Sequence, residues 1–166
     1  MAIAAEPGRR LAASVLARAL GRPLTDRALG RDRLTVLAYH RIADPEDLGD
    51  LHPGVVSATP AMFARQMDWV AREFSVIALD DLLAHAAGER PLPERPLLIT
   101  FDDGYRDNHD VALPVLRARG LPAVLFLVTG AIGTDRVMWW DEVTRLVLRS
   151  PRASAELPPL GRRDLD

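Results

Sequence analysis

The sequence predicts an α/β fold, in which short apolar strands alternate with amphipathic helices. Three observations support this prediction: strand-like runs recur along the chain, one helical stretch carries a clear apolar face, and polar side chains directly follow two of the strands. Alternation of this kind implies parallel strands joined by crossovers, in a layered sheet or a barrel. With 166 residues, 48% of them hydrophobic and 27% charged, the chain is long enough for one such domain with a core.

The first expected elements are a strand and a long helix. Residues 34–39 (LTVLAY) form a short apolar run, which is typical of a buried strand. After an acidic loop, Thr59 is placed to cap a helix whose first residue is Pro60. One face of this helix is apolar, because four hydrophobic residues recur at helical spacing: Phe63, Met67, Val70 and Phe74.

Two further strands and two helices are expected in the middle of the chain. Residues 74–79 (FSVIAL) predict a second strand, and a helix capped by Asp80 should run to Ala87. The apolar run 97–101 (LLITF) predicts a third strand. The next helix should begin near residue 108 and end before a glycine at 120, with Pro114 causing a late start or a kink.

The last elements and the two ends complete the expected organisation. Residues 122–128 predict a fourth strand and residues 139–149 a helix. We expect a core domain over 34–149, preceded by a leader helix over 1–33 and followed by a disordered tail over 150–166. The leader is a poor secretory signal, because acidic and proline residues come early in it, so a cytoplasmic and an envelope-associated location both stay open.

Composition excludes several classes of function. The net charge of −2 gives no basic surface for a nucleic acid, and we expect no nucleic-acid partner. No uncharged run reaches the roughly 18 apolar residues of a transmembrane helix, so no transmembrane segment is expected. The absence of cysteine excludes disulfides, thiolate zinc sites and thiol catalysis. Any metal would therefore be held by carboxylates or imidazoles.

Polar side chains follow two of the predicted strands, where α/β folds place their sites. His40 comes directly after the first strand, and Asp102 and Asp103 come directly after the third. Adjacent carboxylates repel each other unless a divalent cation lies between them. One could then bind the metal while the other accepts a proton from water. The alternatives stay open: Asp-Gly is a common turn dipeptide, and a histidine at a strand end needs no catalytic role.

The segment ITFDDGYRDN, followed by LRARGLPAVLFLVTG, resembles the first motif region of the polysaccharide deacetylases, the NodB-like carbohydrate esterase family. The segments VLAYHRI and WWDEV are similar to one bacterial branch of that family. The resemblance extends over nearly all of residues 34–149. It implies the N-terminal portion of the family's domain, a partial deacetylase-type distorted (β/α) barrel.

The resemblance also implies an activity, the metal-dependent removal of N-acetyl groups from an amino-sugar polysaccharide, for example of a bacterial envelope. By position in the motif, Asp102 would be the general base and Asp103 a ligand of Zn²⁺ or another divalent metal. In the branch with an early Tyr-His pair, the histidine is the acid that protonates the leaving amine, and His40 would take that role. The N-acetylated polysaccharide would be the partner.

The chain departs from the family pattern in its second metal motif. The family completes its metal site with two histidines in H-[ST]-x-x-H-P, whereas the four histidines here include no pair at that spacing: His40, His52, His85 and His109. A catalytic zinc site needs about three protein ligands. About four strands can be recognised, whereas a barrel needs about seven or eight. We therefore expect a truncated, impaired enzyme with an incomplete metal site, for which the missing C-terminal half of the domain is a further partner.

Two other interpretations stay open. The chain could be a non-catalytic carbohydrate-binding or scaffolding module, with Trp139, Trp140 and Tyr105 stacking on sugar faces. It could also be a remnant without function.

Overall fold

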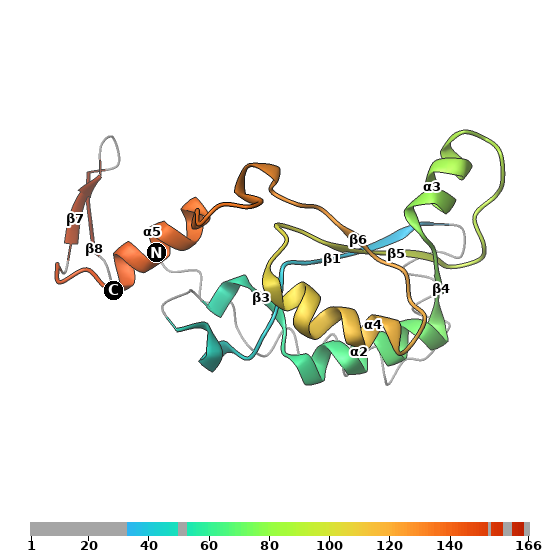
Figure 1. Cartoon of the computed structure of the whole chain (residues 1–166), viewed down its shortest axis with the longest axis horizontal. Helices are drawn as coiled ribbons and strands as arrows, with labels where there is room; N and C mark the ends of the chain where they lie inside the picture. The colour runs from blue at the N-terminus through green and yellow to red at the C-terminus, as the bar shows by residue number, and fades with distance from the viewer. Residues whose placement is uncertain (1–32, 50–52, 153, 158–160, 165–166) are drawn as a thin grey trace.

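The computed structural model describes residues 33–49, 53–152, 154–157 and 161–164. The expected leader over 1–33 therefore lies almost entirely outside the described residues. The central element is a four-stranded sheet (Figure 1). Its strands are β1 (Thr35–Tyr39), β4 (Ser75–Val76), β5 (Pro96–Phe101) and β6 (Val124–Leu125).

Four α-helices and several shorter elements accompany this sheet. The helices are α2 (Pro60–Glu73), α3 (Leu79–Ala86), α4 (Leu113–Arg117) and α5 (Trp139–Leu148). A π turn, η3 (Asn108–Ala112), leads into α4, and the 3-10 turns are η1 (Pro45–Leu48), η2 (Pro53–Val55) and η4 (Thr129–Ala131). The small sheets are β2 (Arg41–Ile42) with β3 (Val56–Ala58), which are parallel, and β7 (Ser154–Leu157) with β8 (Gly161–Asp164), which are antiparallel.

Strand β5 organises the central sheet, because every other strand of that sheet pairs with it in parallel. β1 pairs along its whole length, from Thr35 opposite Leu97 to Tyr39 opposite Phe101. On the other edge of β5, β4 pairs with the beginning of the strand and β6 with its end. All six side chains of β5 are buried, as a central strand requires. The predicted α/β class with parallel strands is thus confirmed, while the described strands do not close into a barrel.

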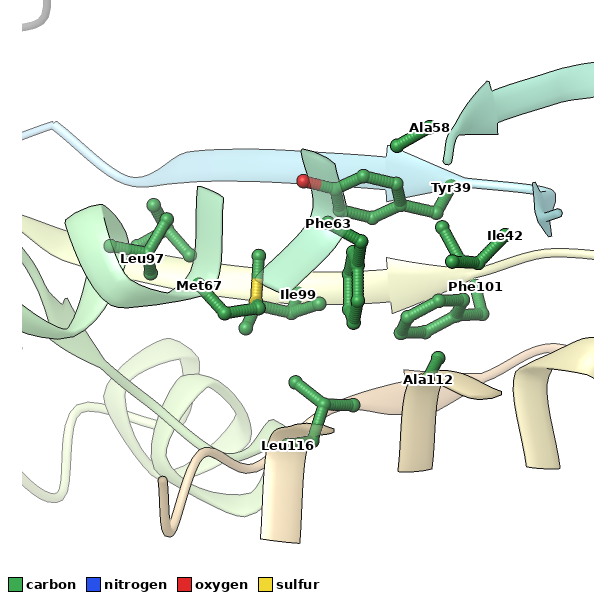
Figure 2. Close-up of a cluster of buried hydrophobic side chains, with 11 residues drawn as sticks. Tyr39, Ile42, Ala58, Phe63, Met67, Leu97, Ile99, Phe101, Ala112 and Leu116 are labelled. Atoms are coloured by element: carbon green, nitrogen blue, oxygen red, sulfur yellow. The ribbon is translucent and has the colours of Figure 1, made fainter. Parts of the chain in front are cut away.

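The core lies between this sheet and helices α2 and α4 (Figures 1 and 2). Three aromatic rings meet at its centre: Phe63 of α2 lies edge-on to Tyr39 at 5.2 Å between ring centroids, and Tyr39 stacks on Phe101 at 5.5 Å. Met67 and Ile99, both fully buried, extend the same layer. The core therefore packs directly behind the residues with which β1 and β5 end.

Helix α2 forms as the sequence predicts. The Thr59 hydroxyl accepts a hydrogen bond from the Met62 N–H at 3.2 Å, which is the expected N-cap, and Pro60 is the first helical residue. The apolar face is buried through Phe63, Met67 and Val70. Burial of this stripe against β1 and β5 holds α2 on the sheet.

Several elements differ from the prediction. The N-cap of the middle helix α3 is Ala78 and not Asp80, and the helix begins at Leu79, because the Asp81 carboxylate accepts the Ala78 N–H at 2.8 Å and so fixes an earlier start. Strands β4 and β6 are two residues long, because only those residues pair with β5. The helix around Pro114 begins as the π turn η3, whose wider spacing accommodates a residue without an N–H.

The largest difference lies near the end of the chain. Residues 150–166 were expected to be disordered, but β7 and β8 form an antiparallel pair there, from Ser154 opposite Asp164 to Leu157 opposite Gly161. Together with α5, this pair of strands lies away from the sheet (Figure 1). None of the helices in the described ranges is long and apolar enough to cross a bilayer.

Candidate active site

The ends of β1 and β5 bring two predicted site residues together. The two strands finish in register at Tyr39 and Phe101, and the Asp102 N–H then donates to the Tyr39 carbonyl at 2.8 Å, which extends the pairing by one residue. His40 and Asp102 consequently lie side by side, with 3.9 Å between the imidazole Nε2 and the carboxylate Oδ2. Their side chains are 50% and 36% exposed. Both can therefore be reached by a molecule in solution.

Asp103 lies in a tight turn after the strand. Its φ is 71°, and Gly104 follows with φ 75°, so two successive residues are left-handed. Aspartate tolerates this conformation better than most side chains do, and glycine adopts it freely. At Gly104 a Cβ would lie only 2.5 Å from Leu127 Cδ2. The Asp103 carboxylate makes no hydrogen bond or ion pair with the described part of the chain, and it lies close enough to Tyr105 to contribute to that residue's raised pKa.

A polar cluster joins this turn to helix α5. The Tyr105 hydroxyl donates to Asp141 Oδ2 at 3.1 Å and accepts from Trp140 Nε1–H at 2.7 Å. Burial, with the nearby Asp141 carboxylate, raises the pKa of Tyr105 to about 12. Tyr105 and Trp140 are therefore engaged with each other. Of the three aromatic residues expected to stack on sugars, Trp139 is the one that is largely exposed, at 69%.

Sequence analysis missed a second cluster, formed by residues that follow the acidic turn. Asp107 accepts from Arg41 Nε at 2.8 Å, and Asn108 Nδ2 donates to the His40 carbonyl at 2.7 Å. The Arg41 guanidinium also lies 4.8 Å from the centre of the Tyr105 ring. The only signal in the sequence was the run RDN directly after DDGY. Nothing in that run predicts contacts with β2 and with His40, the residue between β1 and β2.

The other histidines lie away from the two strand ends or are engaged elsewhere. His85 Nδ1 lies 3.1 Å from the Arg90 carbonyl oxygen, and His109 Nδ1 lies 2.8 Å from Asp110 Oδ1. The contacts with His109 and Arg106 lower the pKa of Asp110. His52 lies outside the described residues. Across the described ranges, no three histidines, aspartates or glutamates are grouped as metal ligands would be. The donor types at the site suit a divalent metal, but their number falls short.

A cavity of about 260 Å³ lies beside the site, between the end of β5, β6 and the helical segment after the turn. Its lining is mainly apolar and includes Phe101, Leu113, Leu116 and Val124, with Tyr105 and Asn108 at one side. His40, Asp102 and Asp103 do not line it. The cavity is therefore a feature of the packing behind the turn, and the reactive groups lie outside it.

Comparison with known proteins identifies relatives of this chain. Residues 89–150 match the family model described as polysaccharide deacetylase. A poly-beta-1,6-N-acetyl-D-glucosamine N-deacetylase of Staphylococcus epidermidis is 31% identical over 107 residues, covering 59% of this chain and 37% of that protein. The structure of IcaB from Ammonifex degensii is 29% identical with a TM-score of 0.53, covering 64% of this chain and 42% of that one.

A second solved structure has the same degree of likeness. The de-N-acetylase from Aggregatibacter actinomycetemcomitans is 25% identical with a TM-score of 0.53, and the match covers 61% of this chain and 39% of that one. The chain spans about a third of the length of the Staphylococcus relative and of a Bacillus subtilis relative. This coverage fits the N-terminal portion of the family's domain. The chain is thus similar to polysaccharide deacetylases, and residues 89–150 carry the match to that family's model.

Proposed function

We propose that Asp102, Asp103 and His40 form part of the catalytic centre of a metal-dependent polysaccharide de-N-acetylase, acting on an N-acetylated amino-sugar polymer. The observation that carries the proposal is the juxtaposition of His40 Nε2 and Asp102 Oδ2 at 3.9 Å, on two exposed side chains at the ends of paired strands. The relatives named for deacetylation of poly-N-acetylglucosamine support the choice of substrate class.

The geometry suits a hydrolysis that uses one base and one acid. The Asp102 carboxylate accepts a proton from water, and the water oxygen forms a bond to the carbonyl carbon of the N-acetyl group. The carbon–nitrogen bond then breaks while a protonated His40 gives its proton to the departing nitrogen. The products are acetate and the free amine of the sugar. Because both side chains are exposed, a polymer can reach them without prior opening of the fold.

Asp103 is proposed as a ligand of Zn²⁺ or another divalent metal. Its carboxylate has no partner among the described residues and lies next to the proposed base. When bound, such an ion would polarise the carbonyl of the N-acetyl group. The other ligands would have to come from outside the described residues, because these hold no group of three. We accordingly propose that turnover by this chain alone is low and that its sheet is one part of a deacetylase-type (β/α) barrel.

The proposal is tested by titrating the full chain with ZnCl₂ in a calorimeter. Asp103→Ala should weaken zinc binding by about tenfold or more, because it removes a direct ligand. Asp68→Ala, which removes an exposed carboxylate from α2, is the matched control and should bind zinc as the wild type does. Equal affinity in Asp103→Ala and the wild type would rule out the metal role of Asp103. Acetate release from N-acetylglucosamine oligomers at an ordinary enzymatic rate would contradict the proposed low turnover.

A non-catalytic sugar-binding module remains the second candidate, favoured by the exposure of Trp139. Its ring lies 5.5 Å from that of Trp140, in an edge-on arrangement that leaves one aromatic face open. If this function is correct, Trp139→Ala should abolish the change in tryptophan fluorescence on adding N-acetylglucosamine oligomers, while Asp102→Asn should leave that change intact.

A further inference from the structure

We propose that Asp107 and Asn108 are positioning residues, which fix the backbone of residues 40–42 so that the His40 imidazole lies opposite Asp102. The catalytic meaning of this arrangement rests on the proposed function, whereas the positioning itself does not. We call Asp107 and Asn108 the clamp.

The backbone around His40 is held by side chains from two other segments. The His40 N–H donates to Ser57 Oγ at 2.8 Å, and the His40 carbonyl accepts from Asn108 Nδ2 at 2.7 Å. Two residues further on, the Ile42 N–H donates to Asp107 Oδ1 at 3.1 Å. The imidazole itself is half exposed, and its Nε2 lies 3.9 Å from Asp102 Oδ2. A tightly fixed backbone thus carries an accessible side chain, which is the arrangement that a positioned reactive group requires.

The part of the Asn108 side chain that holds the backbone of residues 40–42 is its amide N–H₂ group. The side chain is buried, with 7% of the residue exposed, and Nδ2 lies near two acceptors, the His40 carbonyl and Asp107 Oδ1. Its Oδ1 is buried without a hydrogen-bond partner among the described residues. An unpaired buried acceptor is unfavourable, and an apolar side chain of the same size would avoid it. The bond to the His40 carbonyl is therefore what distinguishes asparagine from leucine at this position.

Asp107 fixes the same segment, residues 40–42, through its carboxylate. Its carboxylate bridges Arg41 Nε and the Ile42 N–H, and the Asp107 and Arg41 side chains are only 11% and 17% exposed. Arg41 is the residue directly after His40, and its guanidinium lies over the ring of Tyr105. Residues that follow the acidic turn thus hold the chain next to His40. Because charge-assisted hydrogen bonds are strong when shielded from water, this anchor is stiffer than a surface ion pair.

The main test replaces Asn108 by leucine in the full chain. Leucine retains the volume and the burial but cannot donate to the His40 carbonyl. In an NMR spectrum of the histidine rings, the His40 signals should shift or broaden, and the Ile42 amide should exchange with solvent about tenfold faster. The ring signals of His85, which lies on α3 away from the clamp, should stay in place. Ser57→Ala removes the bond on the other side of His40 and should move the same ring signals.

The matched control is Asp68→Asn. It weakens an aspartate–arginine pair of the same geometry, Asp68 Oδ1 with Arg119 Nε at 2.8 Å, at a place remote from His40. Asp107→Asn weakens the corresponding pair in the clamp. The clamp variant should move the His40 ring signals, and the control should not. Should Asn108→Leu fail to fold, Asp107→Asn and Ser57→Ala still decide the question.

Enzyme kinetics distinguish a loss of positioning of His40 from a general loss of protein stability. With N-acetylglucosamine oligomers and added Zn²⁺, Asn108→Leu should lower kcat about tenfold or more and leave KM within about twofold, because misplaced reacting groups slow the chemical step. Because turnover by this chain alone is proposed to be low, an absence of acetate release would leave the zinc titration as the test of the proposed function and the NMR result as the test of the clamp. Unmoved His40 signals in both Asn108→Leu and Ser57→Ala would overturn the positioning proposal, and so would equal shifts of His40 and His85.

Discussion

Helices α2 and α5 carry the same sequence signal and have different surroundings. Both are amphipathic, with hydrophobic residues recurring at helical spacing. In α2 that stripe is buried against β1 and β5, and Phe63 and Met67 are fully inaccessible. In α5 the stripe faces outward, since Trp139 is 69% exposed and Leu146 is 65% exposed. An apolar stripe therefore predicts a helix and which face of that helix favours burial. It does not predict whether another part of the protein packs on that face.

The two helices are consequently held by different forces. The contacts of α2 are those of a packed core, and its first turn is capped by Thr59. The contacts of α5 that the structure shows with the acidic turn are polar, through Trp140 and Asp141 to Tyr105. Exposed apolar surface on a helix commonly marks a region that contacts another surface. The following substitutions measure how much each set of contacts contributes to stability.

The largest difference is expected from truncating one apolar side chain in each helix. Phe63→Ala should lower the free energy of unfolding by about 3–5 kcal/mol, because it leaves a cavity among Tyr39 and Phe101. Leu146→Ala on α5 should change it by about 0.5 kcal/mol or less, because that side chain is already in water. Urea denaturation measures both. Equal losses would show that α5 is packed as tightly as α2.

A smaller effect is expected from removing each tyrosine hydroxyl. Tyr105→Phe leaves Asp141 and the Trp140 N–H without their hydrogen-bond partner, which should cost about 1–3 kcal/mol. The loss should be local, so hydrogen exchange should quicken in α5 and remain slow in α2. Tyr39→Phe is the matched control, because it removes a hydroxyl that donates to Gln66 at 3.0 Å in the core region. If Tyr105→Phe leaves exchange in α5 unaltered, the polar cluster does not hold that helix.

Helix capping offers a third comparison. Thr59→Ala should destabilise the protein by about 1 kcal/mol, because it removes the acceptor for the Met62 N–H. Helix α5 has no side-chain cap, although Met138 has the extended backbone of an N-cap residue. Met138→Ser should therefore raise the helix content of α5 measured by circular dichroism. A fall in helix content would show that the Met138 side chain matters more than a cap.

The last effect concerns pH; it is absent at neutral pH and is shared by the two regions. Burial raises the pKa of both Tyr39 and Tyr105 to about 12, above the ordinary value of 10.0. Because the folded pKa is the higher one, this contribution to stability is fully present below about pH 10 and is lost as the pH rises toward 12. Absorbance of the phenolate form should show both tyrosines ionising near pH 12 in the native protein and near pH 10 in denaturant. Native ionisation at the lower pH would contradict the burial of the two rings.

Much of the fold could be predicted because its signals are local. The spacing along α2, its Thr59 cap and the apolar run of β5 each lie within one short segment, and the approach of His40 to Asp102 follows from placing both residues at parallel strand ends. The start of α3 was missed because the side chain of Asp81, the residue after the expected cap Asp80, fixes it. The early end of β4 depends on which residues reach β5, and no local pattern gives that.

The clamp could not be predicted for a related reason. Asn108 and His40 are 68 residues apart in the chain, and the contact of Asp107 with Ile42 spans 65. Such contacts depend on the register between β1 and β5 and on the π turn that follows. A run of three polar residues after an acidic turn contains neither piece of information. Sequence patterns therefore predicted that His40 and Asp102 lie together, but not that Asp107 and Asn108 contact the backbone beside them.

The parallel pairing of β1 with β5 has a consequence for the order of events during synthesis. Each residue of β1 pairs with one that lies 62 positions later, as Thr35 does with Leu97. A nascent chain consequently holds β1 without its partner while all of α2 and α3 are being made. Closing so long a loop is slow relative to forming a helix, and an unpaired apolar strand is prone to aggregation meanwhile. The emergence of β5 from the ribosome thus sets the earliest moment at which His40 and Asp102 can meet.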